Sequence, residues 1–282
     1  MPAQSKLGLG TVQFGLKYGI SNTSGKTPSE EVNKIIDFAR QSHIKYLDTA
    51  SAYGDSEEAL GKCGIEDYRV VSKFMPVGYK NQTISSQLNE SLDKLGLKSV
   101  YGYLAHRPET LLEEPQQWEE LLLLKNTEKI TKIGFSLNKK SELEQLLAAD
   151  MTPDIVQVPF NVFDSRFQEH LKELKEKGCE VHSRSAFLQG LFFVPADSLE
   201  AFFDPVKEII RSLQSTYGNE LPGALLNYVL QKDFIDVVIL GVENLDQLKD
   251  NIENIRNSTA VNLEIPYIEE RIVMPSFWPS NN

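Results

Sequence analysis

Short apolar runs alternate with amphipathic segments along most of the chain. The runs are rich in β-branched and aromatic residues, which is typical of buried strands. They lie at residues 6–11, 45–50, 68–74, 99–106, 132–137, 155–160, 180–185 and 236–241. The segments between them repeat apolar residues at i, i+3 and i+4, as in EEVNKIIDFARQ and FQEHLKELKEKG. This second pattern predicts helices that bury one face.

The alternation predicts an α/β protein with a parallel sheet, because strands that are separated by helices pair in the same direction. Eight such units in 282 residues are typical of a (β/α)8 TIM barrel, here a single domain over residues 1–282. The alternative is an open doubly wound sheet, whose dinucleotide-binding turn reads G-x-G-x-x-G. Here Gly8 and Gly10 are followed by the next glycine only at Gly15, so that spacing fails.

The charge and the cysteines exclude several classes of partner. The net charge of −11 argues against nucleic acid or an anionic membrane as the main partner. The chain has no apolar run of membrane-spanning length, and its N-terminus has no apolar signal region. Cys63 and Cys179 are far apart and are expected to stay reduced, without a metal. We therefore expect a soluble cytoplasmic protein that holds no metal ion.

Polar side chains stand at the C-terminal ends of the predicted strands. In a (β/α)8 barrel these strand ends meet at one mouth, where active sites are built. Each such residue alone is ordinary, because a lysine or arginine at a strand end is usually solvated and an aspartate usually stabilises a turn. Tyr53 follows on the loop after the second strand, and its combination with an acid, a lysine and a histidine favours a catalytic site. The strand-end residues are Asp48, Lys73, His106, Ser136, Gln157 and Arg184.

The order and spacing of several motifs resemble the aldo-keto reductase superfamily, in its bacterial-type branch. The motifs are LDTASAYGDSEEALG, VSKF, LAHRP, IGFSLN, IVQVPFN and VILGVENLDQLKDN. The similarity extends from about Leu7 to about Ile252. It implies a (β/α)8 barrel that reduces a small aldehyde or ketone with NADP or NAD and without a metal ion.

Four residues have roles that this resemblance implies and that elementary chemistry explains. Reduction of a carbonyl needs a hydride from the nicotinamide and a proton on the developing alkoxide. Tyr53 is the expected general acid, since a free phenol has a pKa of about 10 and a nearby ammonium lowers that value. Lys73 is expected to supply the ammonium, and Asp48 to hold it in place. His106 is expected to donate a hydrogen bond to the substrate oxygen.

The resemblance also implies a set of cofactor contacts. Ser136 and Gln157 are expected at the nicotinamide carboxamide, although Leu137 stands where the family often has asparagine. Many members stack an aromatic ring on the nicotinamide from the seventh strand, whereas this chain has Arg184 there, which either stacks in its place or binds an anionic substrate group. The expected contacts are Gly10, Thr11, Asp48, Ser136, Gln157, Arg184, Gly190, Gly241, Glu243, Gln247 and Asn251.

The choice between NADP and NAD depends on the loop after the eighth strand. NADP is the family default, and a lysine or arginine in this loop usually binds its 2′-phosphate. Glu243 occupies that neighbourhood, and an acid repels a phosphate but accepts from a ribose hydroxyl. NAD use therefore stays open. Lys249 or Arg256 is the candidate cation that would restore NADP binding.

Two other functions compete with carbonyl reduction. A lysine at a strand end can form a Schiff base, so a lyase or aldolase that uses Lys73 is one alternative. A non-catalytic, nucleotide-sensing subunit with the same fold is the other. The opening GLGTVQFGLKYGI resembles reductases that accompany sugar and polysaccharide biosynthesis, which suggests a sugar-derived carbonyl. The candidate pocket aromatics are Phe14, Tyr18, Phe160 and Trp278.

Overall fold

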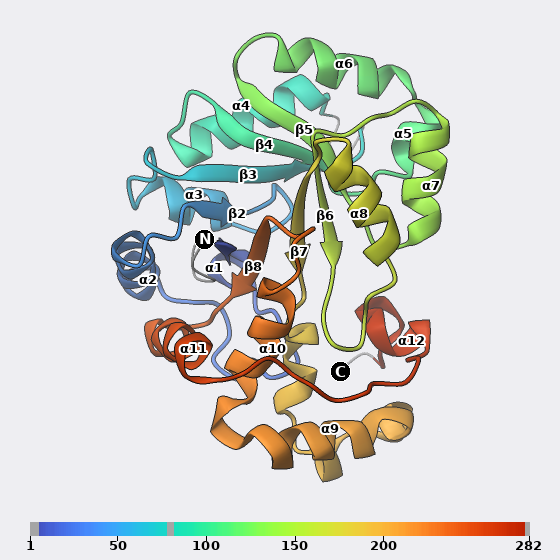
Figure 1. Ribbon diagram of the computed structural model, residues 1–282. Helices are drawn as coiled ribbons and strands as arrows, with labels where there is room; N and C mark the ends of the chain where they lie inside the picture. Colours follow the sequence, from blue (N-terminus) through green and yellow to red (C-terminus); the bar gives the residue numbers. More distant parts are fainter. Residues whose placement is uncertain (1–5, 78–81, 280–282) are drawn as a thin grey trace.

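The computed structural model describes residues 6–77 and 82–279. Within these ranges eight parallel strands close into a barrel, in which each strand pairs with the next and β8 pairs with β1 (Figure 1). The strands are β1 Leu7–Gly10, β2 Tyr46–Asp48, β3 Arg69–Phe74, β4 Val100–Ala105, β5 Ile130–Ser136, β6 Ile155–Pro159, β7 Glu180–Arg184 and β8 Val237–Gly241. Seven of the predicted runs contain one strand each, and β5 overlaps the run at 132–137 but begins earlier, at Ile130. The prediction of a (β/α)8 barrel is confirmed.

Helices surround the barrel and return the chain to the start of each next strand (Figure 1). No helix in the described part of the chain is long and apolar enough to cross a membrane. The helices are α1 Val12–Gly15, α2 Ser29–Gln41, α3 Ser56–Gly61, α4 Ile84–Leu95, α5 Thr110–Glu113, α6 Gln116–Lys125, α7 Lys140–Ala148, α8 Gln168–Glu176, α9 Asp204–Tyr217, α10 Leu221–Leu230, α11 Leu245–Asn257 and α12 Glu270–Val273.

The main core lies between the outer face of the sheet and the helices. It includes Leu9, Leu47 and Phe135, each with no exposed surface. Side chains of alternate strand residues point into the barrel, where Val71, Leu104 and Ile155 form a small apolar layer. This layer separates the barrel into two polar ends, one at the start of the strands and one at their C-terminal mouth.

A second apolar cluster joins α9 to the C-terminal segment of the chain. Figure 1 shows α9 in orange, set apart from the sheet, with the red C-terminal segment passing close to it. Apolar residues of both segments are buried together, and they include Val206, Ile210, Leu213, Val261 and Ile272. The C-terminal segment therefore holds α9 and the loop before it beside the mouth of the barrel.

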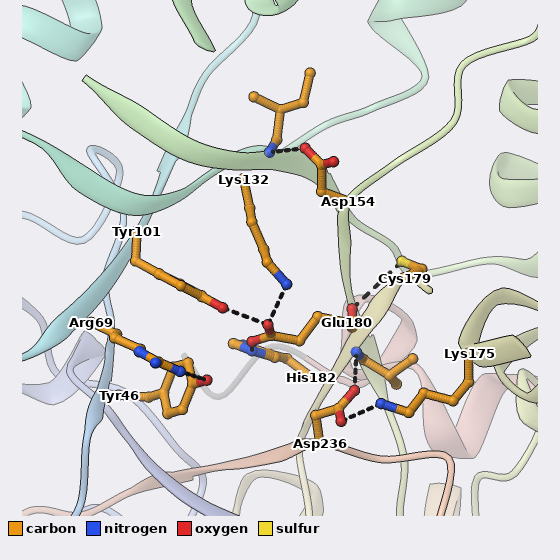
Figure 2. A network of polar contacts seen from close by, with 12 residues as sticks. Tyr46, Arg69, Tyr101, Lys132, Asp154, Lys175, Cys179, Glu180, His182 and Asp236 are labelled. Atoms are coloured by element: carbon orange, nitrogen blue, oxygen red, sulfur yellow. Dashed lines mark hydrogen bonds and ion pairs between the residues drawn. The ribbon is translucent and has the colours of Figure 1, made fainter. Parts of the chain in front are cut away.

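The N-terminal end of the barrel is closed by a network of polar side chains (Figure 2). Glu180 lies at its centre and accepts hydrogen bonds from Tyr101 Oη at 2.6 Å, Lys132 Nζ at 2.5 Å and His182 Nε2 at 2.7 Å. Arg69 lies over the rings of Tyr46 and Tyr101, 5.5 and 5.1 Å from their centroids. Burial opposes ionisation of Glu180, but its bonded partners outweigh this and hold its pKa well below the usual value. The network thus fills the end of the barrel opposite the mouth.

Candidate active site

A cavity of about 620 Å³ opens at the C-terminal ends of the strands. Most of the predicted site residues line it: Gly10, Thr11, Asp48, Tyr53, His106, Ser136, Arg184, Gly190, Gly241, Glu243, Gln247 and Asn251. Lys73 and Gln157 do not, because both are fully buried beneath the cavity floor. The fold thus brings the predicted residues to one mouth, at two depths.

Asp48, Lys73 and Tyr53 form a contiguous group between β2, β3 and the loop after β2. Lys73 Nζ lies 2.8 Å from both carboxylate oxygens of Asp48, 2.9 Å from Thr49 O and 3.4 Å from Tyr53 Oη. Burial of Lys73 opposes its positive charge, but Asp48 and Tyr53 outweigh burial and raise its pKa above the usual value. Lys73 is therefore a charged ammonium beneath the phenol.

The direction of these hydrogen bonds determines where the Tyr53 proton can go. An ammonium carries donors only, so Tyr53 Oη must accept at its contact with Lys73. The hydroxyl proton of Tyr53 is then free to point away from Lys73. Because Tyr53 lines the cavity, the group can present an acidic proton to a bound molecule.

The loop that carries Tyr53 is held by several close contacts. The backbone N–H and the hydroxyl of Ser51 both donate to Lys73 O at 3.0 Å. Ser56 Oγ donates to Thr11 O at 2.8 Å, which ties the start of α3 to the end of β1. A Cβ at Gly15 would lie 1.7 Å from Tyr53 O, so only glycine permits this approach. These contacts hold the backbone around Tyr53 in place and so position its phenol at the mouth.

His106 directly follows β4, and its ring lies beside that of Tyr53. Their ring centroids are 5.7 Å apart and the rings meet edge to face, at 84°. Burial, together with the charges of Lys73, Arg184 and Arg107, lowers the pKa of His106 to about 3. A neutral imidazole has one donor and one acceptor nitrogen, so His106 can offer a neutral hydrogen-bond donor next to the phenol.

The residues expected at a carboxamide are arranged differently from the sequence motif. Gln157 Nε2 donates to Asp48 Oδ1 at 2.6 Å, whereas its Oε1 is buried without a partner. Leu137 is fully buried in the main core and cannot replace the family asparagine. Asn138, one residue later, lines the cavity instead. Successive residues of an extended segment point to opposite sides. The polar side chain that faces the cavity is therefore Asn138, one position after the residue that the family motif indicates.

Arg184 is the permanent cation among the described residues that line the cavity. Its Nη2 donates to Leu137 O at 3.0 Å and to Asn138 Oδ1 at 2.6 Å. Both acceptors are neutral, and no ion pair of Arg184 is found with any described residue. The guanidinium is therefore anchored beside Ser136 with its charge uncompensated.

The opposite end of the cavity, formed by the start of α11, carries acids. Glu243 and Asp250 line it together with Gln247 and Asn251. Gln247 Oε1 accepts from Glu243 N at 2.8 Å, so this loop is held on its helix. Burial raises the pKa of Glu243, and the bond to Gln247 opposes that rise. The two cations suggested by the sequence, Lys249 and Arg256, do not line the cavity.

Lys249 has an alternative environment on the outer face of α11. Its Nζ lies 3.9 Å from Asp246 Oδ1 and 5.9 Å from the centroid of the Phe38 ring on α2. The side chain thus points toward α2. A helix places positions two residues apart on different faces, which explains why Gln247 faces the cavity and Lys249 does not.

Sequence reasoning named one of four pocket aromatics correctly and missed other lining residues. Tyr18 lines the cavity, and its hydroxyl accepts from Gln189 Nε2 at 2.9 Å. The other three candidates are wrong: Phe14 and Phe160 are fully buried, and Trp278 packs on Phe203 beside α9. The lining residues that were missed include Gln13, Asn138, Phe187, Gln189, Phe193 and Asp250. Most lie in loops after strands, where no period marks the inward face.

The active sites of (β/α)8 barrel enzymes lie at the C-terminal ends of the strands. In this chain Tyr53 and Lys73 are in contact at that end of the barrel. The sequence model of the Aldo/keto reductase family matches residues 6–271, so the chain belongs to this family. It is therefore an oxidoreductase. The chain is also similar to the NAD/NADP-dependent indole-3-acetaldehyde reductase of Schizosaccharomyces pombe, with 26% identity over 235 residues that cover 78% of this chain and 79% of the relative.

Solved structures show the same fold. The holo form of aldo-keto reductase AKR11C1 from Bacillus halodurans matches with a TM-score of 0.73 and 20% identity, over 91% of this chain and 88% of that one. Its apo form matches with a TM-score of 0.70 and 22% identity, over 96% and 91% of the two chains. At these identities the likeness concerns the barrel alone.

Proposed function

We propose that this protein reduces a small aldehyde or ketone to an alcohol with NADH or NADPH. The observation that carries the proposal is the contact between Lys73 Nζ and Tyr53 Oη at 3.4 Å, at the floor of the mouth. When bound, the nicotinamide supplies a hydride to the carbonyl carbon. Tyr53 is the general acid that protonates the carbonyl oxygen, and Lys73 stabilises the phenolate that remains.

The neighbouring residues complete this chemistry. His106 is neutral at physiological pH because its pKa is about 3, so it orients the substrate oxygen as a donor without protonating it. Asp48 balances the charge of Lys73, and Gln157 fixes one oxygen of Asp48. These preorganised groups act where charge develops on the carbonyl oxygen.

The cavity fits a dinucleotide in size and in chemistry. Its volume of about 620 Å³ lies in the range of cofactor sites, roughly 300–1,000 Å³. Gly10 and Gly241 are paired at the ends of β1 and β8 and present bare backbone to the cavity. Ser136 and Asn138 would bind the nicotinamide end, and Arg184 would lie against its ring. Gln247 and Asn251 would face the adenosine.

We further propose that NAD is preferred to NADP. The start of α11 offers a helix N-terminus, which favours a phosphate, but no lysine or arginine that could pair with a 2′-phosphate is among the described residues at this end of the cavity, where the acids Glu243 and Asp250 stand instead. Neither Lys249 nor Arg256 lines the cavity. The Glu243 carboxylate suits a ribose 2′-hydroxyl, to which it offers an acceptor.

Reductase activity is favoured over the two alternatives. A Schiff-base lysine must be an uncharged nucleophile, whereas Asp48 keeps Lys73 charged by raising its pKa. A nucleotide sensor has no need for a phenol, a lysine and a histidine at one point. For the substrate, a sugar-derived carbonyl stays our hypothesis, and the cytoplasm is the expected location.

The test is oxidation of NADH or NADPH with a panel of small aldehydes and sugar-derived carbonyls, followed at 340 nm. We expect turnover that requires the carbonyl compound. Borohydride trapping with the same substrates should leave Lys73 unmodified. Covalent labelling of Lys73 without cofactor oxidation would establish the lyase instead.

A further inference from the structure

A buried carboxyl group lies directly behind the catalytic pair. Glu57, on α3, is 2% exposed, and its Oε1 accepts from Ser72 Oγ at 2.6 Å. Ser72 has no exposed surface and precedes Lys73 in β3. Because side chains alternate along a strand, Lys73 points into the barrel while Ser72 points out toward α3 and α4. Glu57 therefore contacts the strand that carries Lys73 from its outer face.

The surroundings of Glu57 keep the carboxyl group in place. Burial raises its pKa, and the Ser72 hydroxyl opposes that rise. On α4, the charge of Lys94 lowers the pKa of Glu57 and the charge of Glu90 raises it. The phenol of Tyr103 on β4 is buried close by. A carboxyl group without access to water must be hydrogen-bonded or it destabilises the fold. The contact with Ser72 is accordingly costly to break.

This contact closes a ring of short connections around the catalytic pair. Tyr53 lies four residues before Glu57, and Ser56 N donates to Tyr53 O at 3.1 Å as α3 begins. Ser72 is bonded to Lys73 through the chain, and Lys73 Nζ contacts Tyr53 Oη. Any displacement of α3 from β3 would consequently move the phenol relative to the ammonium.

We propose that Glu57 is a positioning residue, which holds α3 and the Tyr53 loop at a fixed distance from the strand that carries Lys73. The proposal rests on the proposed reductase function of Tyr53 and Lys73. Glu57 complements Ser51, which holds Lys73 O from the mouth side of the strand. The strand is thus held on two sides, and a misplacement of about 1 Å in such a site can reduce the rate about a hundredfold.

The test compares Glu57→Ala with Glu57→Gln in the full-length chain. The glutamine keeps an oxygen acceptor for Ser72, so we expect wild-type kcat. The alanine should lower kcat by about 10- to 100-fold, with the Kd for NADH unchanged. It should also increase the solvent deuterium isotope effect on kcat, because proton transfer from a displaced phenol becomes rate-limiting. If Glu57→Ala does not fold, the smaller change Ser72→Ala takes its place. It too should lower kcat and increase the solvent deuterium isotope effect.

A matched control separates positioning from general stability. Asn227 on α10 is also buried and donates to Ile255 O and Ser258 O. Asn227→Ala should lower Tm without changing kcat or the isotope effect. If Glu57→Ala behaves like this control, the proposal is overturned.

A crystal structure of Glu57→Ala gives an answer that does not depend on turnover. We expect a longer separation of Tyr53 Oη and Lys73 Nζ than the 3.4 Å of the wild type. An unchanged separation would overturn the positioning role. Absence of carbonyl reduction in the wild type would instead refute the proposed function, while this distance still decides the role of Glu57.

Discussion

Lys73 Nζ and Tyr53 Oη meet at 3.4 Å although the two residues lie 20 positions apart in the chain. The lysine comes from the end of β3 and the tyrosine from the loop after β2, so the pairing of these strands brings them together. The carboxylate of Asp48, at the end of β2, accepts a hydrogen bond from the same ammonium. The contact makes the phenol a hydrogen-bond acceptor on one side and leaves its proton for the cavity.

Tyr53→Phe should abolish carbonyl reduction and leave cofactor binding intact. Loss of a general acid typically reduces the rate by about 10²–10⁴-fold, and the phenyl ring keeps the packing on His106. Stopped-flow measurement of kcat and a fluorescence titration of NADH would show this separation. A phenylalanine variant with near-normal kcat on a ketone would mean that another group is the acid.

Lys73→Met should destabilise the protein as well as inactivate it. Asp48 is 4% exposed, and a buried charge that loses its partner typically costs about 3–5 kcal/mol. The double variant Asp48→Asn/Lys73→Met removes both charges, so it should recover much of the free energy of unfolding but no activity. Urea denaturation of the three proteins would test this. Equal stability of the single and double variants would contradict it.

Glu243→Lys should shift the cofactor preference toward NADPH. A charge-assisted contact to the 2′-phosphate is worth about 1.5–3 kcal/mol, which is roughly a tenfold to hundredfold change in Kd. Asp246→Lys is the matched control, since its side chain is 89% exposed on α11, the helix that follows Glu243, and does not line the cavity. Titrations with NADH and NADPH would measure both variants. Tight NADPH binding by the wild type, with no gain in Glu243→Lys, would make Glu243 irrelevant to the choice.

Acidification should destabilise the protein through His106. Its pKa is about 3 in the folded state and about 6.5 in an unfolded chain, so the unfolded state binds more protons between these values. This contribution to stability is present above about pH 6.5 and is lost as the pH falls toward 3, with a slope of at most about 1.4 kcal/mol per pH unit. His106→Gln should unfold with a shallower pH dependence between pH 7 and 5. Parallel curves for the two proteins would refute this.

Glu180→Gln should destabilise the barrel at neutral pH without affecting the mouth. The pKa of Glu180 is lowered in the folded state, so its contribution is present above about pH 4.3 and is lost at lower pH. Hydrogen bonds to a charged group are worth about 1.5–3 kcal/mol each. The difference in unfolding free energy between variant and wild type should therefore shrink as the pH falls below 4. A loss of kcat in the folded variant would show instead that this network affects the site.

Sequence periodicity was enough to predict the strands and the barrel. Strand residues alternate between two environments and helices bury one face, and both patterns are local properties of the chain. The parallel barrel then places every strand end at one mouth, so Asp48, Lys73 and His106 were expected together. The structure brings them together, and their catalytic roles stay a prediction.

Only the tertiary structure decided how deep each side chain lies in the barrel and whether it points into the cavity. Gln157 lies under the cavity against Asp48, because depth along a strand is set by the stagger of its neighbours. Its expected contact with the cofactor stays a prediction. Asn138 rather than Leu137 faces the cavity, since a shift of one residue reverses the side on which a side chain lies. Lys249 is excluded from the cavity by the docking of α11 on α2.

The chain by itself therefore determined which chemical groups are present and at which end of the barrel they gather, because local pattern and parallel pairing are sufficient for that. The partners of each group were decided by contacts between distant segments. Glu57 and Ser72 show the difference: the sequence marks one as a helix residue and the other as a strand residue, and only the packing of α3 on β3 joins them. Such contacts depend on the positions of whole elements, which no local pattern records.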